Sequence, residues 1–314
     1  MTVDTNVRAS LYMILGMTGF VCGDVLVKSL DGRLPNGQII LVRGVLLGAV
    51  LGVVLWRRGL LSRLDEAHHR GCYARSFAEL GGTVMFLAAL ERLPFASISA
   101  ILQALPLAVT LGAALFLGEQ VGWRRWLAIV IGFGGVLLIV RPGSESFEPA
   151  ALLMVACVCF AAARDLFTRA LPPSIPSLLV TAMTSLVATI AGAVWVLLAR
   201  NWVSMRVDEV VTLAGCAACL FVGYQFLVLA MRTGEIAYVV PYRYVSLLIA
   251  IALGALLFDE YPDGWTITGA GIIVATGLFS LYRELAGRRR ACVTRGVVPV
   301  ANGVAVVGKD EGRE

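Results

Sequence analysis

The sequence predicts an all-α membrane protein with ten transmembrane helices, arranged as two inverted five-helix repeats around a central cavity. Hydrophobic residues make up 59% of the 314 residues and charged residues only 15%, whereas soluble domains hold roughly half and a quarter. The apolar residues fall in runs of about 20, a length that crosses a hydrocarbon core of ~30 Å. Several features also recur at a fixed offset of 141 residues, which indicates an internal repeat.

Ten apolar runs are expected to form the spanning helices, and prolines and charged residues in short connections set their ends. Their expected ranges are 10–28, 37–56, 72–91, 95–118, 124–141, 150–170, 177–199, 209–231, 236–258 and 265–283. We expect a first repeat at 1–148, a second at 149–286, and a basic, disordered cytoplasmic tail at 287–314.

The distribution of basic residues predicts the orientation. If both termini are cytoplasmic, the cytoplasmic ends of the spans and the tail together hold eighteen Lys and Arg residues, and the outer ends hold six. An excess of basic residues marks the cytoplasmic side of a membrane protein. The sequence therefore predicts a multi-pass protein of the inner (cytoplasmic) membrane with both termini in the cytoplasm.

The internal repeat is clearest in its charged residues. Three like pairs stand at the same offset of 141: Asp24 with Asp165, Lys28 with Arg169, and Glu119 with Glu260. Each repeat holds five spans, an odd number, so the two repeats must cross the membrane in opposite directions. Inverted repeats of this kind place a binding site near the midplane and allow it to face either side in turn.

Three stretches resemble a known family. The segment LPLAVTLGAALFLGEQVGWRRWLAIVIGFGGVLLIVRPG (105–143) is similar to the fourth and fifth helices of the EamA branch of the drug/metabolite transporter superfamily. PYRYVSLLIAIALGALLFDE (241–260) is similar to its ninth helix, and the opening GDVLVKSL…GQIILVRG (23–44) also resembles that branch. The resemblance covers nearly all of residues 10–285, with Asp259 as a departure from the glycine that usually precedes the glutamate.

The resemblance implies a secondary active transporter that moves a small metabolite by alternating access. Within the branch, R-Y-x-S-L-L and GFxGVLxxxRPG look closest to carriers of the riboflavin or S-adenosylmethionine type. We also weigh an intramembrane lipid-modifying enzyme and a non-transporting membrane subunit. Short internal loops and only two histidines favour the carrier over the enzyme.

Charged residues inside the spans are the main site candidates, because such residues usually face protein or water and have a function. At ~1.5 Å per residue, Glu79, Asp165 and Arg243 form an inner charged layer. Asp24 and Arg43 form an outer one. These layers are interpreted as gates or as substrate and proton sites, and the alternative is static pairing that locks the helices.

Arg243 is the strongest substrate candidate, since tyrosines flank it and its equivalent in the first repeat is Leu102. Other polar candidates for the cavity lie on the spans, and each could instead be a helix-packing contact: Tyr242, Tyr244, Gln103, Gln225, Tyr224 and Tyr238.

The remaining partner assignments follow from the same patterns. The chain has no GxxxxGK[ST] loop for ATP and no HExxH or Cys/His metal spacing, so no catalytic residues, cofactor or metal are expected. Its basic residues adjoin apolar runs, which favours a lipid bilayer rather than nucleic acid as their partner. A small-molecule substrate is expected, and a homodimer is left open.

Overall fold

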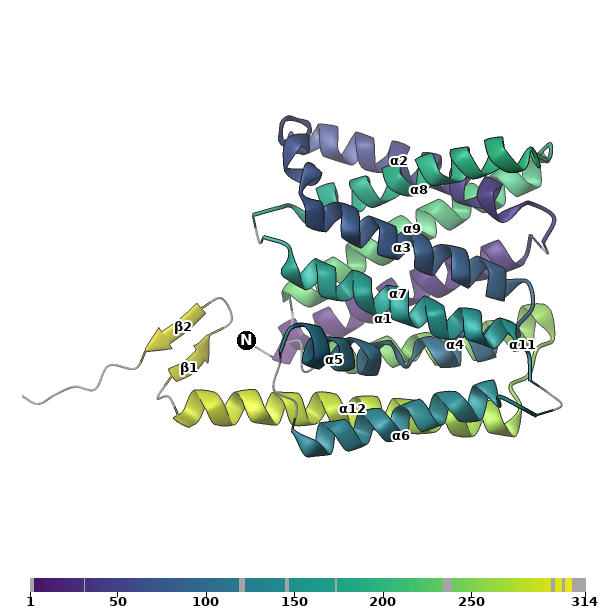
Figure 1. Cartoon of the computed structure of the whole chain (residues 1–314). Coiled ribbons are helices and arrows are strands. Elements are labelled where there is room, and N and C mark those ends of the chain that lie inside the picture. Colours follow the sequence, from purple (N-terminus) through teal and green to yellow (C-terminus); the bar gives the residue numbers. More distant parts are fainter. Residues whose placement is uncertain are drawn as a thin grey trace, which may run out of the picture.

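The computed structural model describes residues 3–30, 32–118, 122–144, 147–172, 174–233, 239–294, 297–300 and 303–306. Figure 1 shows the long helices lying side by side with their connections at the two ends of one bundle. We call the end at which helix α1 begins the proximal end, and the end at which α1 finishes the distal end. The sequence predicts that the proximal end is cytoplasmic.

The first repeat contains the following helices: α1 (Val3–Lys28), α2 (Asn36–Arg57), the 3₁₀ helix η1 (Leu60–His68), α3 (Arg70–Leu90), α4 (Phe95–Leu102), α5 (Leu105–Phe116) and α6 (Trp123–Val140). The second contains α7 (Ala150–Ala170), α8 (Ser177–Ala199), α9 (Val207–Thr233), the 3₁₀ helix η2 (Val240–Tyr244), α11 (Val245–Phe258) and α12 (Gly264–Thr294).

The predicted all-α membrane fold is confirmed. Within the described residues, nine segments are long and apolar enough to cross a membrane. The expected span at 72–91 is not among the nine, although it forms helix α3, because Arg75 and Glu79 lower its mean hydropathy. Helix α3 nevertheless lies inside the bundle, where it packs against α7 and α8. Arg75 and Glu79 therefore lie inside the bundle, where charged residues usually have a function or form ion pairs.

Two spans that the sequence predicts as continuous helices are interrupted. In the fourth span, α4 ends and Gln103 lies between it and α5, which has Pro106 in its first turn. In the ninth span, the 3₁₀ turn η2, with Pro241 in its first turn, ends at Tyr244 before α11 begins. Gln103 and Tyr244 are 141 residues apart, so both repeats break at equivalent positions. Pro106 accounts for the break in the fourth span, because it clashes with the carbonyl of Leu102 in the preceding turn. In the ninth span, Pro241 lies in the first turn of the 3₁₀ helix that precedes the break.

Packing between the repeats follows a two-fold pattern. Helix α1 packs on α9 and α7 packs on α3, which are the same pairing with the two repeats exchanged. The pairs α2–α8, α4–α11 and α6–α12 each map onto themselves. At the α2–α8 crossing, the hydroxyl of Ser185 donates to the carbonyl of Gly44 at 2.9 Å across a separation of 141 residues. Equivalent residues of the two halves therefore touch, which places this contact close to a pseudo-two-fold axis.

Small residues allow the closest of these approaches. A side chain at Gly44 would meet Thr189, and one at Gly192 would meet the backbone of Leu41. Gly135 of α6 and Gly269 of α12 lie against each other in the same way. This agrees with the general use of small residues at helix contacts in membranes.

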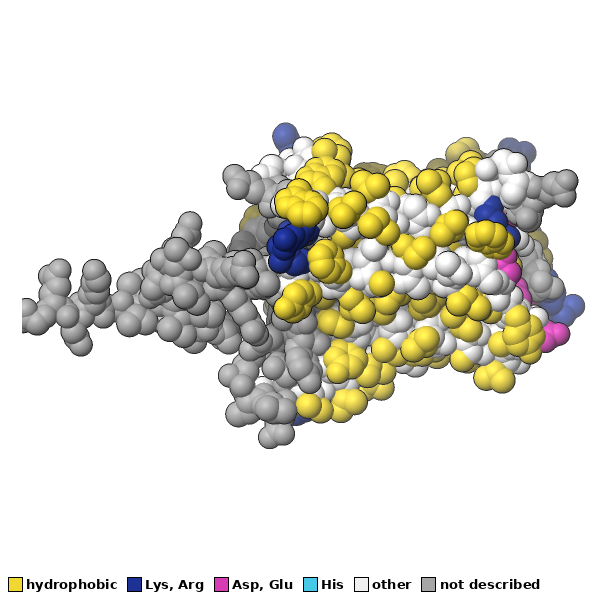
Figure 2. Space-filling model, turned by 90° about the horizontal axis from the view of Figure 1, so that it is seen from below, with side chains coloured by type: hydrophobic (Ala, Val, Ile, Leu, Met, Phe, Trp, Pro, Cys, Tyr) yellow, Lys and Arg dark blue, Asp and Glu magenta, His cyan; other side chains and the backbone are white. Residues whose placement is uncertain are grey.

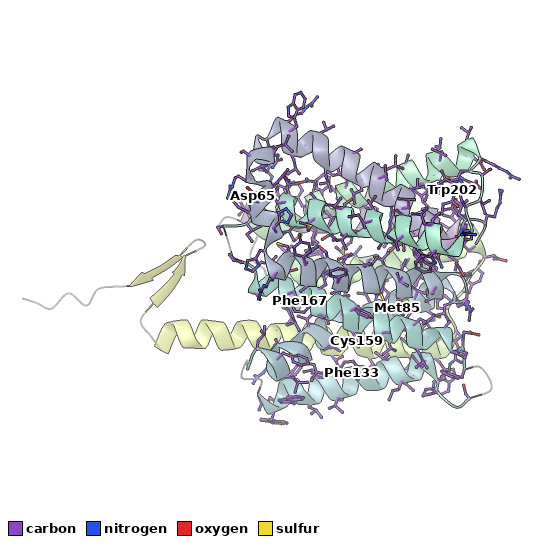
Figure 3. All side chains as sticks on the ribbon, turned by 45° about the horizontal axis from the view of Figure 1, so that its top comes forward. Asp65, Met85, Phe133, Cys159, Phe167 and Trp202 are labelled. Atoms are coloured by element: carbon purple, nitrogen blue, oxygen red, sulfur yellow. The ribbon has the colours of Figure 1, made fainter. Side chains whose placement is uncertain are left out.

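The side chains divide into a packed interior and an apolar exterior. Side chains from neighbouring helices fill the space between the ribbons (Figure 3), and Met85 of α3 and Phe133 of α6 pack against one core cluster. Figure 2 shows hydrophobic side chains along the length of the bundle, with charged ones near its ends. Large apolar residues such as Phe116, Leu137 and Ile267 are exposed. An apolar exterior of this kind suits contact with lipid.

The described part of the tail contains the end of a helix and two short strands. Helix α12 continues to Thr294, and strands β1 (Val297–Val300) and β2 (Gly303–Val306) pair antiparallel. Both strands are rich in valine, which favours extended structure, and only two residues separate them, as in a tight hairpin.

Candidate functional site

A cluster of charges lies in the proximal half of the bundle, between helices α3 and α7. Arg164 contacts Glu79, with Nη1 and Oε2 3.1 Å apart. The same guanidinium binds Asp165, where Nε and Nη2 lie 2.9 and 2.8 Å from Oδ1. One arginine therefore serves both carboxylates of the predicted inner layer. Arg164 is one of the eighteen basic residues predicted at the cytoplasmic side, and its pairing with both carboxylates was not predicted.

Arg75 joins this cluster from the proximal turns of α3. It is buried and donates to the hydroxyls of Thr168 on α7, at 3.0 Å, and Thr184 on α8. Glu79 lies near enough to interact with it electrostatically. The two threonines are neutral, so these bonds orient Arg75 without neutralising it.

Arg243 lies at the interruption of the ninth span, next to the same cluster. It interacts electrostatically with Asp165 and Arg164. Among the described residues, however, no carboxylate lies within ion-pair distance of its guanidinium. The side chain is partly accessible rather than fully buried. Within the described residues, the Arg243 guanidinium therefore has no carboxylate partner, and it is available to an anionic group of a ligand.

The two interrupted spans meet beside Arg243. The side-chain amide of Gln103 donates to the hydroxyl of Ser246 at 3.1 Å. That hydroxyl donates in turn to the carbonyl of Arg243 at 2.7 Å. Gln103, predicted as a cavity residue, thus connects the break in one repeat to the break in the other.

The tyrosines that flank Arg243 point to different neighbours. Tyr242 packs with an apolar cluster that includes Met13 and Met17 of α1. Tyr244 is buried, and its hydroxyl lies where a side chain at Gly277 of α12 would stand. Glycine at position 277 therefore makes room for the Tyr244 ring.

The predicted outer layer, Asp24 and Arg43, lies in the distal half of the bundle. Asp24 and Arg43 interact electrostatically, and Arg43 also hydrogen-bonds the sulfur of Cys216. In the described residues no ion pair forms between Asp24 and Arg43. Positions 43 and 216 are equivalent to positions 184 and 75, so the same contact recurs in the other half with the arginine on the opposite partner.

A cavity of about 130 Å³ opens between α2, α8 and α9 in the proximal half. Two predicted residues line it, Tyr224 and Gln225, together with Phe221, Thr181 and Arg58. The hydroxyl of Tyr224 donates to Oε1 of Glu79 at 3.3 Å. Tyr224 therefore separates the cavity from the charged cluster and contacts both.

A half-buried ion pair, which was not predicted from the sequence, joins three segments at the distal end. Lys28 Nζ lies 2.6 Å from Glu260 Oε1 and also donates to the carbonyl of Leu93 at 3.2 Å. Glu260 accepts from the backbone N–H of Phe95 at 2.7 Å. Lys28 also stands over the rings of Phe95 and Phe258. We call this group the distal lock.

Most of the predicted site residues therefore lie in the interior of the bundle. The inner layer, Arg243, Gln103 and Tyr224 gather around the interrupted spans, whereas Asp24 and Arg43 lie in the distal half. Tyr238 and Glu119 fall outside the described residues. The internal repeat offered one signal for Arg164. Arg164 precedes Asp165, whereas the equivalent position before Asp24 in the first repeat is Gly23, so the arginine is specific to the second repeat.

Comparisons with known proteins agree with this architecture. The profile of the EamA-like transporter family matches twice, at residues 7–141 and 148–282. The chain is also similar to a solved crystal structure with a TM-score of 0.63 at 19% identity, over 89% of this chain and 99% of that one. At that identity the likeness supports the fold alone.

Three curated relatives are named as transporters. An S-adenosylmethionine uptake transporter of Rickettsia bellii is 26% identical over 87% of this chain and 93% of its own length. A riboflavin transporter of Rhizobium johnstonii is 30% identical over 67% and 69%. A pseudopaline exporter of Pseudomonas aeruginosa is 27% identical over 91% and 100%.

Proposed function

Because the chain belongs to the EamA-like transporter family, we propose that it is a secondary active carrier that moves a small metabolite by alternating access. The chain is a multi-pass membrane protein, and its relatives are transporters of small molecules. What carries the proposal is the pair of interrupted spans. Broken helices at equivalent positions of inverted repeats are typical of transporter substrate sites.

The proposed route runs past Arg243 and Tyr224. Arg243 and the contact between Gln103 and Ser246 lie beside the breaks, and Tyr224 borders the proximal cavity. An arginine guanidinium can donate two parallel hydrogen bonds to one anionic or electron-rich group of a ligand. In this proposal Arg243 holds the substrate, and the charges of the inner and outer layers take part in opening and closing the route.

A riboflavin-like or S-adenosylmethionine-like metabolite is the substrate class that the relatives favour. One relative is named for uptake and another for export, so the relatives leave the direction open. A lipid-modifying enzyme and a non-transporting subunit are the alternatives. The homodimer and the absence of nucleic-acid binding stay predictions.

Transport by reconstituted vesicles tests this function. Vesicles that hold the wild-type protein should accumulate riboflavin, S-adenosylmethionine or another small metabolite from a defined mixture, read by mass spectrometry. Arg243→Lys keeps the charge but loses the planar fork, so uptake should fall at least about tenfold. Arg57→Lys at the exposed end of α2 is the matched control and should transport normally. Normal uptake by Arg243→Lys would overturn the role of Arg243.

Both termini are proposed to be cytoplasmic, so that the proximal end of the bundle faces the cytoplasm. A reporter fused after Ala286 that fluoresces only in the cytoplasm should light up, and an enzyme reporter active only in the periplasm should stay silent. The opposite pattern would reverse the assignment of the two ends.

A further inference from the structure

The charges around the interrupted spans do not balance among the described residues. Three arginines and two carboxylates interact with one another in the proximal half: Arg75, Arg164, Arg243, Glu79 and Asp165. This leaves an excess of one positive charge. In the distal half, Asp24 and Arg43 balance each other.

The hydrogen bonds indicate where the excess lies. Both carboxylates bind Arg164, so its charge is more than matched. Arg75 is fixed by two neutral threonine hydroxyls. Arg243 has neither an ion pair nor a hydroxyl partner for its guanidinium within the described part of the chain, although its side chain remains partly accessible. Arg243 is therefore the arginine that an incoming ligand can reach.

An uncompensated charge inside a membrane protein is costly, because low-dielectric surroundings disfavour the charged form. A bound anion removes that cost and gains a charge-assisted hydrogen bond with the guanidinium. A cation at the same place would add a second unpaired positive charge. The free energy of binding therefore depends strongly on the sign of the ligand's charge.

We propose that the substrate is a small organic anion with one net negative charge, of the carboxylate class, whose anionic group binds Arg243. This inference rests on the proposed carrier function and names the substrate class of the same site. It favours an anion over the neutral riboflavin and the net cationic S-adenosylmethionine for which two relatives are named. The polar contact between Gln103 and Ser246 lies on one side of the site. The Tyr224 ring on the cavity wall offers a planar group a stacking partner.

The first test measures the empty protein. Arg243→Gln removes the excess charge, so the apparent melting temperature of the purified variant should rise by about 2 °C or more. Arg57→Gln, at an exposed position, should leave it unchanged. A lower melting temperature, or failure of Arg243→Gln to fold, would show that Arg243 already has a structural partner and would overturn the proposal.

The second test uses three ligands that share a ring and differ in charge. Nicotinate is an anion, nicotinamide is neutral and 1-methylnicotinamide is a cation. Nicotinate at millimolar concentration should raise the melting temperature of the wild-type protein and should not raise that of Arg243→Gln. Equal shifts with the three compounds, a larger shift with the cation, or no shift with nicotinate would each overturn the proposal.

Vesicle uptake separates this inference from the carrier function. If wild-type vesicles accumulate anionic metabolites from a mixture of anionic, neutral and cationic ones, both statements are supported. Uptake of only neutral or cationic metabolites would overturn the anionic class and leave the carrier function standing. Absence of any uptake would overturn the carrier function itself.

Discussion

The two ends of the bundle are held together differently. At the distal end, side chains far apart in sequence connect separate helices. Lys28 binds Glu260 across 232 residues, and the amide of Gln38 exchanges two hydrogen bonds with the backbone of Val203 across 165 residues. Arg33 of the α1–α2 connection lies 3.1 Å from the buried Glu209 at the start of α9. A cavity of about 220 Å³ lies at the margin of this end, between α4, α6 and α12.

In the proximal half, the long-range links of the described residues lie further inside the bundle, at Arg75 and in the charged cluster, rather than at the ends of the helices. Arg63 pairs with Glu66 only three residues away, and it reaches the carbonyl of Ser174 at 3.0 Å. The cavity lined by Tyr224 opens here, and the charged cluster lies beneath it. The two ends therefore differ in where their side-chain links lie, while each end has a cavity, of about 130 Å³ at the proximal end and about 220 Å³ at the distal end.

The largest expected effect comes from the charged cluster. Arg164→Gln leaves Glu79 and Asp165 without their counter-charge inside the membrane, so it should cost about 3–5 kcal/mol of stability. A large fall in the yield of folded protein and in its melting temperature should follow. Arg57→Gln is the matched control and should change stability by less than about 0.5 kcal/mol. A fall of the same small size in both variants would argue that the cluster is well hydrated.

The distal lock should give the next effect. Lys28→Gln should cost about 1–3 kcal/mol, because the Glu260 carboxylate then lacks its charged partner while it keeps the N–H of Phe95. Exchange of the two charges, Lys28→Glu with Glu260→Lys, should recover part of that loss. Recovery stays partial, since a lysine at position 260 cannot accept from Phe95. Additive losses in the double variant would mean that the two charges do not interact.

The smallest effect is expected at the edge of the distal end. Asp263 accepts from the backbone N–H of Thr266 and pairs with Arg141 at 2.6 Å. Slight burial acts to raise the pKa of Asp263, but the Thr266 hydrogen bonds and the charge of Arg141 outweigh it and lower that pKa below its usual value of 3.8. The ionised carboxylate therefore stabilises the fold above the usual pKa, and this contribution is lost as the pH falls through the lowered one.

Asp263→Asn should then cost at most about 1 kcal/mol at pH ~7, because the pair is exposed and screened. The difference in melting temperature between wild type and variant should shrink as the pH falls below ~4. A difference that grows on acidification would contradict the lowered pKa.

Hydropathy and the 141-residue offset were sufficient to predict the helical membrane fold and its two repeats. The breaks at Gln103 and Tyr244 were not predicted, because a mostly apolar run of about 20 residues has the length of one continuous spanning helix. Only Pro106 and Pro241 mark them, and a proline near a helix end is also compatible with a continuous span.

The charged candidates were found because any charge inside an apolar run is conspicuous. Their partners were not, since pairing depends on how helices rotate about their axes. Arg164 stands next to Asp165 in sequence and looked like an interfacial residue, yet its guanidinium turns inward to Glu79. The Lys28–Glu260 pair likewise joins two segments that are close only once the repeats have packed.

The contact between Ser185 and Gly44 has a mechanical consequence. Points on a two-fold axis stay in place when the halves on either side of it exchange shapes, whereas points far from the axis travel furthest. The α2–α8 crossing therefore lies on the pivot line of the proposed movement, as do the other helix pairs that map onto themselves. Lys28 and Glu260 lie at the distal ends of their segments, so a small rotation about that line separates them by a larger distance.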